Sequence, residues 1–334
     1  MNVVARPVIY RHFHRIAWLA VALTLCVVVF GAFVRLSDAG LSCPDWPTCY
    51  GRAAWPKAVD EAASHVASEI RPFETHKAWR EQVHRFLAGG LILTTFGLAW
   101  LVWRRRRELP TVAAVLLAAS VLIVFQALLG MWTVTWKLKP IVVMAHLIGG
   151  LSTFCLLAYV ALRLTLPPLA RVDTGALRRL VIVGLVLVAL QIALGGWTSA
   201  NYAALSCGLD FPTCAGQWWP PTDFREAFVL WRGIGVNYEG GVLDADARTA
   251  IQLTHRIGAI IVLGHLLGVI AAAWRRGLGG WAIAVLAALA LQIALGISNV
   301  VFGLPLPIAT LHNAGAALLL FVLLGLLVRL RREV

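Results

Sequence analysis

Four of the nine histidines lie in long apolar segments at repeated spacings, and their side chains are suited to binding a metal. They are His84, His146, His255 and His312. His84 and His255 each lie 20 residues before an arginine that follows the apolar segment, and for His146 and His312 this interval is 17 residues. In an α-helix these intervals rise about 30 Å and about 26 Å. The four imidazoles are therefore predicted to lie at nearly the same depth.

Two imidazoles at equal height on facing helices, found twice, are typical of haem iron held between two axial histidines. We therefore interpret the four histidines as haem ligands. The alternative is a structural role, in which the rings only hydrogen-bond between helices. Copper or zinc is less suited, because one or two histidines without a carboxylate or thiolate provide too few protein ligands for either metal. A further histidine, His265, lies on another helical face and is interpreted as structural.

One carboxylate distinguishes the two halves of the chain. Glu81 lies three residues before His84, one helical turn away on the same face. When His84 is aligned with His255, Gln252 takes the place of Glu81. A carboxylate beside a ligand can act as a general base or stabilise a developing cation. We interpret Glu81 as catalytic, and the alternative is an acid favoured at the start of a helix.

Two arginines directly follow candidate ligands in the sequence. They are Arg85, after His84, and Arg256, after His255. Haem propionates require cationic partners, and an arginine at the membrane interface can supply one. Contact with lipid phosphates is an equally good interpretation of both residues.

Four of the six cysteines form two closely spaced pairs in polar segments. Cys43 pairs with Cys49 and Cys207 with Cys214 in the sequence. Each pair can close a short loop as a disulfide, and a redox-active role is the alternative. Neither spacing matches the C-x-x-C-H motif of covalent haem attachment.

The elements that position these residues are predicted to be membrane-spanning helices. Hydrophobic residues make up 60% of the chain and charged residues 13%, with a mean hydropathy of +0.80. This composition excludes a soluble enzyme, a disordered protein and a secreted disulfide scaffold. We predict an all-α polytopic membrane protein, because eight apolar runs are long enough to cross about 30 Å of hydrocarbon. The predicted spans lie near residues 16–36, 82–103, 111–134, 141–163, 177–200, 249–273, 280–301 and 308–329.

The distribution of charge predicts how the chain lies in the membrane. Alternate connections and the terminal segments hold 16 basic and three acidic residues, and the remainder of the chain holds 13 of each. By the positive-inside rule, both termini are cytoplasmic and the two large loops, near 37–81 and 201–248, lie outside. The expected location is the cell inner membrane. The net charge of +13 is thus explained by topology, and no nucleic-acid partner is predicted.

The sequence contains an internal duplication. Three spans place a glutamine four residues before a glycine, and we interpret the glycines as sites of close helix packing. The pairs are Gln126 with Gly130, Gln191 with Gly195, and Gln292 with Gly296, and Gly31 matches in the first span. The cysteine loops recur as well. We predict two tandem four-helix bundles, residues 1–170 and 171–334, related by an axis along the membrane normal.

Taken together, these motifs resemble those of the haem A synthase family along nearly the whole chain. The most diagnostic piece is the run Glu81-Gln82-Val83-His84-Arg85, together with Thr254-His255-Arg256 and Ala39-Gly40-Leu41-Ser42.

The resemblance implies that the two halves of the chain have different functions. His255 and His312 match the ligands of a haem B cofactor, whereas His84 and His146 match the site where haem O is oxidised. Glu81 matches the proposed catalytic carboxylate of the family. The implied reaction converts the C8 methyl group of haem O to a formyl group by successive hydroxylations, giving haem A for cytochrome c oxidase. The family also implies a partnership with haem O synthase and an electron partner, which the sequence does not identify.

Two other functions compete with this interpretation. A di-haem, cytochrome b-like electron carrier explains the four histidines but gives no role to Glu81. A transporter built from parallel repeats would carry charged or broken helices near the middle of the membrane, and the predicted spans show little of either.

Overall fold

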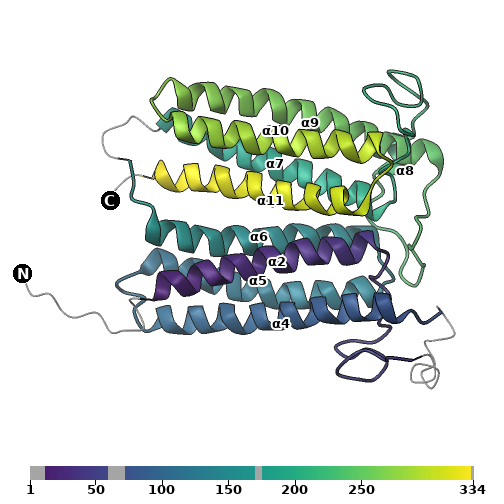
Figure 1. Cartoon of the computed structure of the whole chain (residues 1–334), viewed down its shortest axis with the longest axis horizontal. Coiled ribbons are helices and arrows are strands. Elements are labelled where there is room, and N and C mark those ends of the chain that lie inside the picture. The colour runs from purple at the N-terminus through teal and green to yellow at the C-terminus, as the bar shows by residue number, and fades with distance from the viewer. Residues whose placement is uncertain (1–11, 59–71, 170–174, 332–334) are drawn as a thin grey trace, which may run out of the picture.

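The computed structural model describes residues 12–58, 72–169 and 175–331, and within them eight long helices run side by side (Figure 1). All eight are long and apolar enough to cross a membrane. The prediction of an all-helical, multi-pass membrane protein is therefore confirmed. The helices are α2 (Phe13–Leu36), α4 (Thr75–Trp103), α5 (Pro110–Thr135), α6 (Pro140–Thr165), α7 (Gly175–Ala200), α9 (Ala245–Trp274), α10 (Gly279–Val301) and α11 (Leu306–Arg329), and a short helix, α8 (Phe224–Ala227), lies in the loop before α9.

Local signals in the sequence explain where several helices begin. Pro110 and Pro140 are the first residues of α5 and α6, a position where the missing N–H of proline would have no helical partner. Asp244 caps α9, because its carboxylate accepts a hydrogen bond of 2.8 Å from the backbone N–H of Ala247. In contrast, α4 begins at Thr75, seven residues before its predicted apolar span. The polar segment at its start is therefore helical, and Glu81 lies within the helix.

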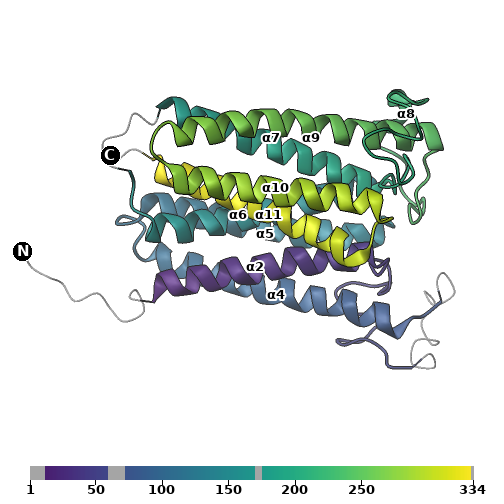
Figure 2. The ribbon, with the colours of Figure 1, turned by 45° about the horizontal axis from the view of Figure 1, so that its top comes forward.

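The helices pack into two rings of four. In the first ring α2 contacts α4, α4 contacts α5, α5 contacts α6, and α6 contacts α2. In the second, α7, α9, α10 and α11 make the equivalent set of contacts. The rings meet through α6 and α11, with further contacts of α6 to α7 and of α11 to α2. Both views accordingly place α4 and α9 on opposite sides of the molecule (Figures 1 and 2).

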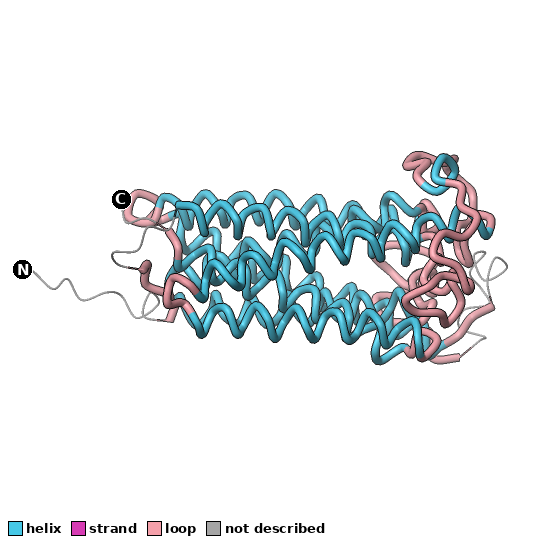
Figure 3. The backbone as a smooth tube through the Cα atoms, turned by 90° about the horizontal axis from the view of Figure 1, so that it is seen from above, coloured by secondary structure: helices cyan, strands magenta, loops and turns pink. Residues whose placement is uncertain are grey.

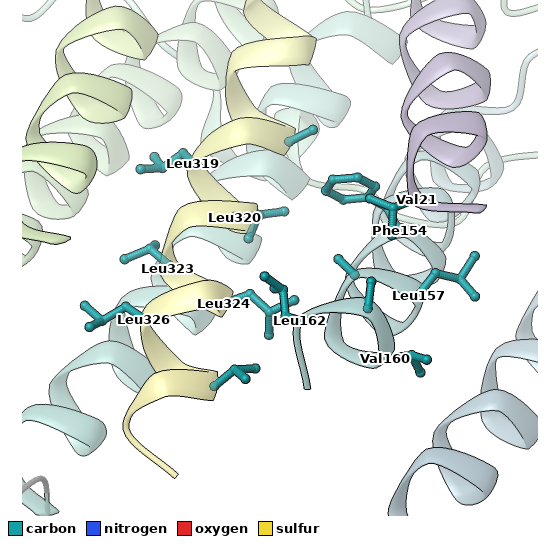
Figure 4. Packing of buried hydrophobic residues seen from close by; sticks show 14 of the residues in the cluster. Val21, Phe154, Leu157, Val160, Leu162, Leu319, Leu320, Leu323, Leu324 and Leu326 are labelled. Atoms are coloured by element: carbon teal, nitrogen blue, oxygen red, sulfur yellow. The ribbon is translucent and has the colours of Figure 1, made fainter. Parts of the chain in front are cut away.

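The interface between the rings is packed with apolar side chains. Phe154 and Leu162 of α6 lie near Leu320 and Leu324 of α11, with Val21 of α2 beside Phe154 (Figure 4). Phe154 is only 2% exposed. In a membrane, such contacts stabilise helix association by close van der Waals packing, since lipid tails are as apolar as leucine. The central helices α6 and α11 are therefore tightly packed, and this packing fixes the position of the histidine on each of them.

The long loops gather at one end of the helices, and the start of α2 and the end of α11 lie at the other end (Figure 3). The loop end is also where α4, α6, α9 and α11 begin. The four candidate histidines lie in the early turns of these helices and are consequently close to the long loops.

Candidate functional site

The four histidines occupy equivalent positions in the two rings. His84 lies on α4 and His146 on α6, and the two side chains are close enough to interact electrostatically. The same holds for His255 on α9 and His312 on α11. Within the described residues, the two helices of each pair make no direct backbone contact, because they lie diagonally across their ring. Each pair of imidazoles thus faces the interior of one ring from opposite sides.

A glycine on a neighbouring helix lies against each imidazole. A Cβ atom added to any of these glycines would crowd the Cε1 atom of the ring. The distances from this Cβ position to Cε1 are 2.7 Å for Gly31 and His84, 3.3 Å for Gly130 and His146, 3.1 Å for Gly195 and His255, and 3.1 Å for Gly296 and His312. The glycines do permit close approach, as the sequence indicated, but the group that approaches each of them is an imidazole.

The residues present fit a haem held by two axial ligands. Each imidazole lies in a glycine cradle, meaning the space beside a glycine of a neighbouring helix. A larger residue in place of the glycine would crowd the ring. The Nδ1 atoms of His84, His146 and His312 are buried without a hydrogen-bond partner. Imidazole rings set between apolar helices match the chemistry of axial haem ligation. Among the described residues, no group of three or more metal-binding side chains competes with this interpretation.

Glu81 is buried and connects α4 to the first disulfide loop. Its side chain is 6% exposed. One carboxylate oxygen, Oε1, forms an ion pair of 2.6 Å with Arg85. The other, Oε2, accepts a hydrogen bond of 2.8 Å from the backbone N–H of Cys43. The carboxylate is therefore held in place one helical turn from His84 by two charge-assisted bonds.

The counterpart of Glu81 is held quite differently. Gln252 is also buried, at 4% exposed, but its Oε1 atom has no hydrogen-bond partner. The asymmetry seen in the sequence thus corresponds to a real difference in structure. A carboxyl group with a partner on each oxygen lies beside His84, and an amide whose oxygen has no partner lies beside His255.

Arg85 and Arg256 bind the outer loops. Each guanidinium donates hydrogen bonds to three backbone carbonyls of a disulfide loop, and two of the three are shorter than 3 Å in each case. The shorter bonds run from Arg85 to Asp45 and Thr48, both at 2.7 Å, and from Arg256 to Asp210 at 2.9 Å and Thr213 at 2.8 Å. The two arginines therefore fasten the loops over the histidines, and contact with haem propionates stays a prediction.

Both cysteine pairs form disulfides in the structure. Cys43 is bonded to Cys49, and Cys207 to Cys214. The first loop is further ordered by Asp45, which accepts bonds from the backbone N–H groups of Tyr50 and Gly51 and from the Thr48 hydroxyl. Burial alone would raise the pKa of Asp45, but these hydrogen bonds outweigh it and hold the pKa below its ordinary value.

Other site predictions have a plain structural outcome. The Nε2 atom of His265 lies 2.9 Å from the carbonyl of Leu180, which agrees with its interpretation as structural. Lys139 was not singled out from the sequence, although it is fully buried just before α6. Its Nζ atom lies 3.3 Å from the centre of the Trp231 ring, a cation–π contact. A lysine before a proline in a tight turn gives little signal in the sequence, because its aromatic partner is distant along the chain.

Comparison with known proteins assigns the chain to a family. The family model COX15-CtaA, described as "Cytochrome oxidase assembly protein", matches residues 14–324. The heme A synthase of Shewanella oneidensis is 43% identical over 92% of this chain and 94% of its own length. The heme A synthases of Caulobacter vibrioides and Rhizorhabdus wittichii are 30% and 28% identical, over 94% and 92% of this chain and 95% and 90% of their own lengths. The chain therefore belongs to the COX15-CtaA family of cytochrome oxidase assembly proteins.

Proposed function

We propose that this protein is a haem A synthase, which oxidises the C8 methyl group of haem O to a formyl group by successive hydroxylations. It is thus an oxidoreductase that acts on a methyl group, and its product, haem A, serves cytochrome c oxidase. The observation that carries the proposal is the arrangement of four imidazoles as two facing pairs, in a chain whose relatives are named heme A synthases.

The proposal assigns one haem to each ring. In the N-terminal half, residues 1–170, His84 and His146 are the ligands of haem O as substrate. In the C-terminal half, residues 171–334, His255 and His312 are the ligands of a haem B cofactor. Bound haem B supplies an iron that exchanges single electrons. The equivalent contacts of the two helix rings support the division into tandem units.

Glu81 supplies the acid–base chemistry. It lies in the half assigned to the substrate, and Arg85 and the Cys43 backbone hold both of its oxygens. From there the carboxylate can stabilise positive charge or accept a proton as the substrate is oxidised. Because Gln252 cannot ionise, the equivalent position in the C-terminal half cannot do the same. This contrast is the reason for placing the reaction beside His84.

The proposed location is the cell inner membrane, with both termini cytoplasmic and the disulfide loops on the outer side. Basic residues dominate the connections at the end opposite the disulfide loops, which is the side the positive-inside rule assigns to the cytoplasm. Disulfides form in oxidising compartments, so the two bonded loops also support this orientation. Haem O synthase, which makes the substrate, is the proposed partner in the membrane, and a separate electron partner is needed to complete the oxidation.

Pigment extraction tests the proposed activity. The protein is produced together with haem O synthase in cells that lack their own haem A synthase, and the extracted haems are separated by chromatography. The proposal predicts haem A or its hydroxylated intermediate. Unaltered haem O with haem B alone would overturn it and would instead support an electron carrier with two haems.

A further inference from the structure

Arg80 is a cation of α4 without an anionic partner, and it directly precedes Glu81 in the sequence. The three lysine and arginine side chains of α4 differ in this respect. Lys77 forms an ion pair of 2.9 Å with Glu74, and Arg85 is paired with Glu81. Within the described residues, the guanidinium of Arg80 forms neither an ion pair nor a hydrogen bond, and its Nε atom is buried. One positive charge of this helix is therefore not balanced by a carboxylate.

The guanidinium of Arg80 lies against α2. Its Cζ atom is 5.0 Å from the centre of the Phe33 ring, a cation–π contact. This contact restrains the guanidinium on one side but gives its N–H groups no acceptor oxygen. An arginine held over an aromatic ring can still bind a carboxylate through two parallel N–H groups.

The contact of Arg80 with Phe33 lies next to the glycine cradle of His84, on its outer side. Arg80 precedes His84 by four residues on α4, so the two side chains share one face of the helix. On α2, Phe33 follows Gly31, the glycine that lies against the His84 ring. Since α2 runs toward the loop end and α4 away from it (Figure 1), both helices place the Arg80 contact nearer the long loops than His84. The difference along α4 is about one turn, or about 5 Å.

The carboxylates of a haem between His84 and His146 are expected on this same outer side. Toward the opposite end of the helices, the first ring is lined by apolar side chains, such as the buried Leu91 and Leu98 of α4. Burial of a carboxylate among such residues is costly unless the charge is paired. The propionates should therefore face the loops, and the apolar edge of the macrocycle should face the membrane interior.

Arg85, the cation that the sequence suggests for the propionates of this half, is already engaged. Its two terminal nitrogens donate to three loop carbonyls and to the carboxylate of Glu81. These four bonds use all the hydrogens of the two nitrogens. Arg80 retains its full set of donors one turn away.

The C-terminal half has no cation in the place of Arg80. When the two halves are aligned on the histidines of α4 and α9, the equivalent residue is Ile251, which is fully buried among apolar side chains. Two adjacent positions thus differ between the halves, Arg80-Glu81 in one and Ile251-Gln252 in the other. Both ionisable side chains belong to the half to which the proposed function assigns the substrate.

We propose that Arg80 binds a propionate of haem O and thereby orients the substrate beside Glu81. This inference rests on the proposed function and names the residue that recognises the acidic edge of the substrate. The C8 methyl group and one of the propionates are substituents of the same pyrrole ring. A residue that holds this propionate therefore limits where the methyl group can lie. Haem B in the other half undergoes no reaction at its substituents, so its site does not need the same recognition.

Haem B and its dimethyl ester test the inference, because the ester lacks the negative charges of the propionates. The N-terminal site is isolated in the full chain by His255→Ala/His312→Ala, and each ligand is titrated while the Soret band is recorded. In this background, Arg80→Gln should weaken the binding of haem B about 10-fold, as expected for loss of a hydrogen bond between charged groups. Binding of the ester should change by less than about threefold, because it has no charge to pair.

Two controls make the cause specific. Lys77→Gln removes a charge of the same helix that is already paired with Glu74, so it should leave the affinity for both ligands unchanged. The second control combines Arg80→Gln with His84→Ala/His146→Ala, which retains only the C-terminal pair. Its binding of haem B should be unchanged by Arg80→Gln, because α4 and α9 lie on opposite sides of the molecule.

Equal losses of affinity for haem B and its ester would overturn the inference, since Arg80 would then act through its packing against Phe33. No loss for either ligand would overturn it as well and would assign the guanidinium to lipid phosphates. If the N-terminal site with Arg80 intact bound neither ligand, that result would contradict the proposed function itself.

Discussion

The two halves of the molecule share a framework and differ in a few buried polar side chains. Each half is a ring of four helices with one candidate ligand histidine on each of two diagonal helices. Each has a disulfide loop held by an arginine, Arg85 in one half and Arg256 in the other. Glu81, however, is replaced by Gln252 in the second half. We infer that the framework sets the position of the candidate ligands, whereas single polar substitutions distinguish the two sites.

The loops over the two sites differ as well. The second outer loop reaches across to the first half, where Trp231 covers Lys139 at the start of α6. Burial lowers the pKa of the Lys139 amine, which has no hydrogen-bond partner. In addition, the backbone N–H of Tyr238 donates a hydrogen bond of 3.1 Å to the carbonyl of Lys137. The outer face of the first half is thus partly built by the second half.

The largest effect is expected from making the first site resemble the second. Glu81→Gln retains an oxygen that can accept from the Cys43 N–H but removes the charge. Product formation should fall about 100-fold or more, as is typical for loss of a general acid or base, while bound haem is largely retained. Chromatography of extracted haems measures the product.

The matched control is the reverse substitution in the second half, Gln252→Glu. It should leave the product level within about twofold of that of the unmodified protein, because the proposed function places only the cofactor in that half. Normal turnover in Glu81→Gln would exclude this carboxylate as an essential acid or base.

A smaller effect is expected from filling the glycine cradles. Gly31→Ala places a methyl group 2.7 Å from the His84 ring, whereas Gly130→Ala places one 3.3 Å from His146. Overpacking of this kind costs about 1–3 kcal/mol, so haem affinity at the N-terminal site should fall about 10-fold for Gly31→Ala and less for Gly130→Ala. Haem titration followed by the Soret band measures both.

The control for the cradle is Gly97→Ala on α4, where an added Cβ meets nothing within 4 Å. Its haem affinity should match that of the unmodified protein. A Gly97→Ala loss as large as that of Gly31→Ala would show that the glycines act through helix flexibility and not through contact with the imidazole.

The smallest effect concerns the first disulfide loop and its dependence on pH. Because the pKa of Asp45 is held below its ordinary value of 3.8, its contribution to loop stability is present above that pH and is lost as the pH falls through the lowered pKa. Reduction of the Cys43–Cys49 bond by a phosphine should therefore accelerate only below pH 3.8, by a few fold. Alkylation of the released thiols and mass spectrometry give the rate.

The comparison variant for this loop is Asp45→Asn, which has no carboxylate to protonate and should lose the step in the pH profile. An acceleration that already begins above pH 5 in the unmodified protein would contradict the assignment of the lowered pKa to Asp45.

Much of the fold could be predicted because membrane spans have a strong signal in composition. Eight apolar runs gave eight helices, and charge together with the duplicated motifs placed the histidines at one end. The start of α4 was less predictable. Hydropathy detects only the apolar part of a helix, so the polar turns from Thr75 to Glu81 lay outside the predicted span.

The candidate site was predictable in its residue types but not in its contacts. The repeat of Gln191 and Gly195 was visible, yet close helix packing explained it until the structure placed the His255 ring against Gly195, with its Nδ1 atom 3.0 Å from the Gln191 amide nitrogen. The bonds of Arg85 to loop carbonyls could not be predicted either, because they join residues about 40 positions apart through a loop without regular structure. Local patterns predict helices, whereas contacts between distant segments require the folded chain.

The central claim, that two imidazole pairs each hold one haem, is tested most directly by the amount of haem that the purified protein binds. In a titration with haem B, the unmodified chain should bind two haems with low-spin spectra. The variants His84→Ala/His146→Ala and His255→Ala/His312→Ala should each bind one. A chain that binds no haem while its helices remain folded, or whose binding is unchanged by either pair of substitutions, would contradict the account.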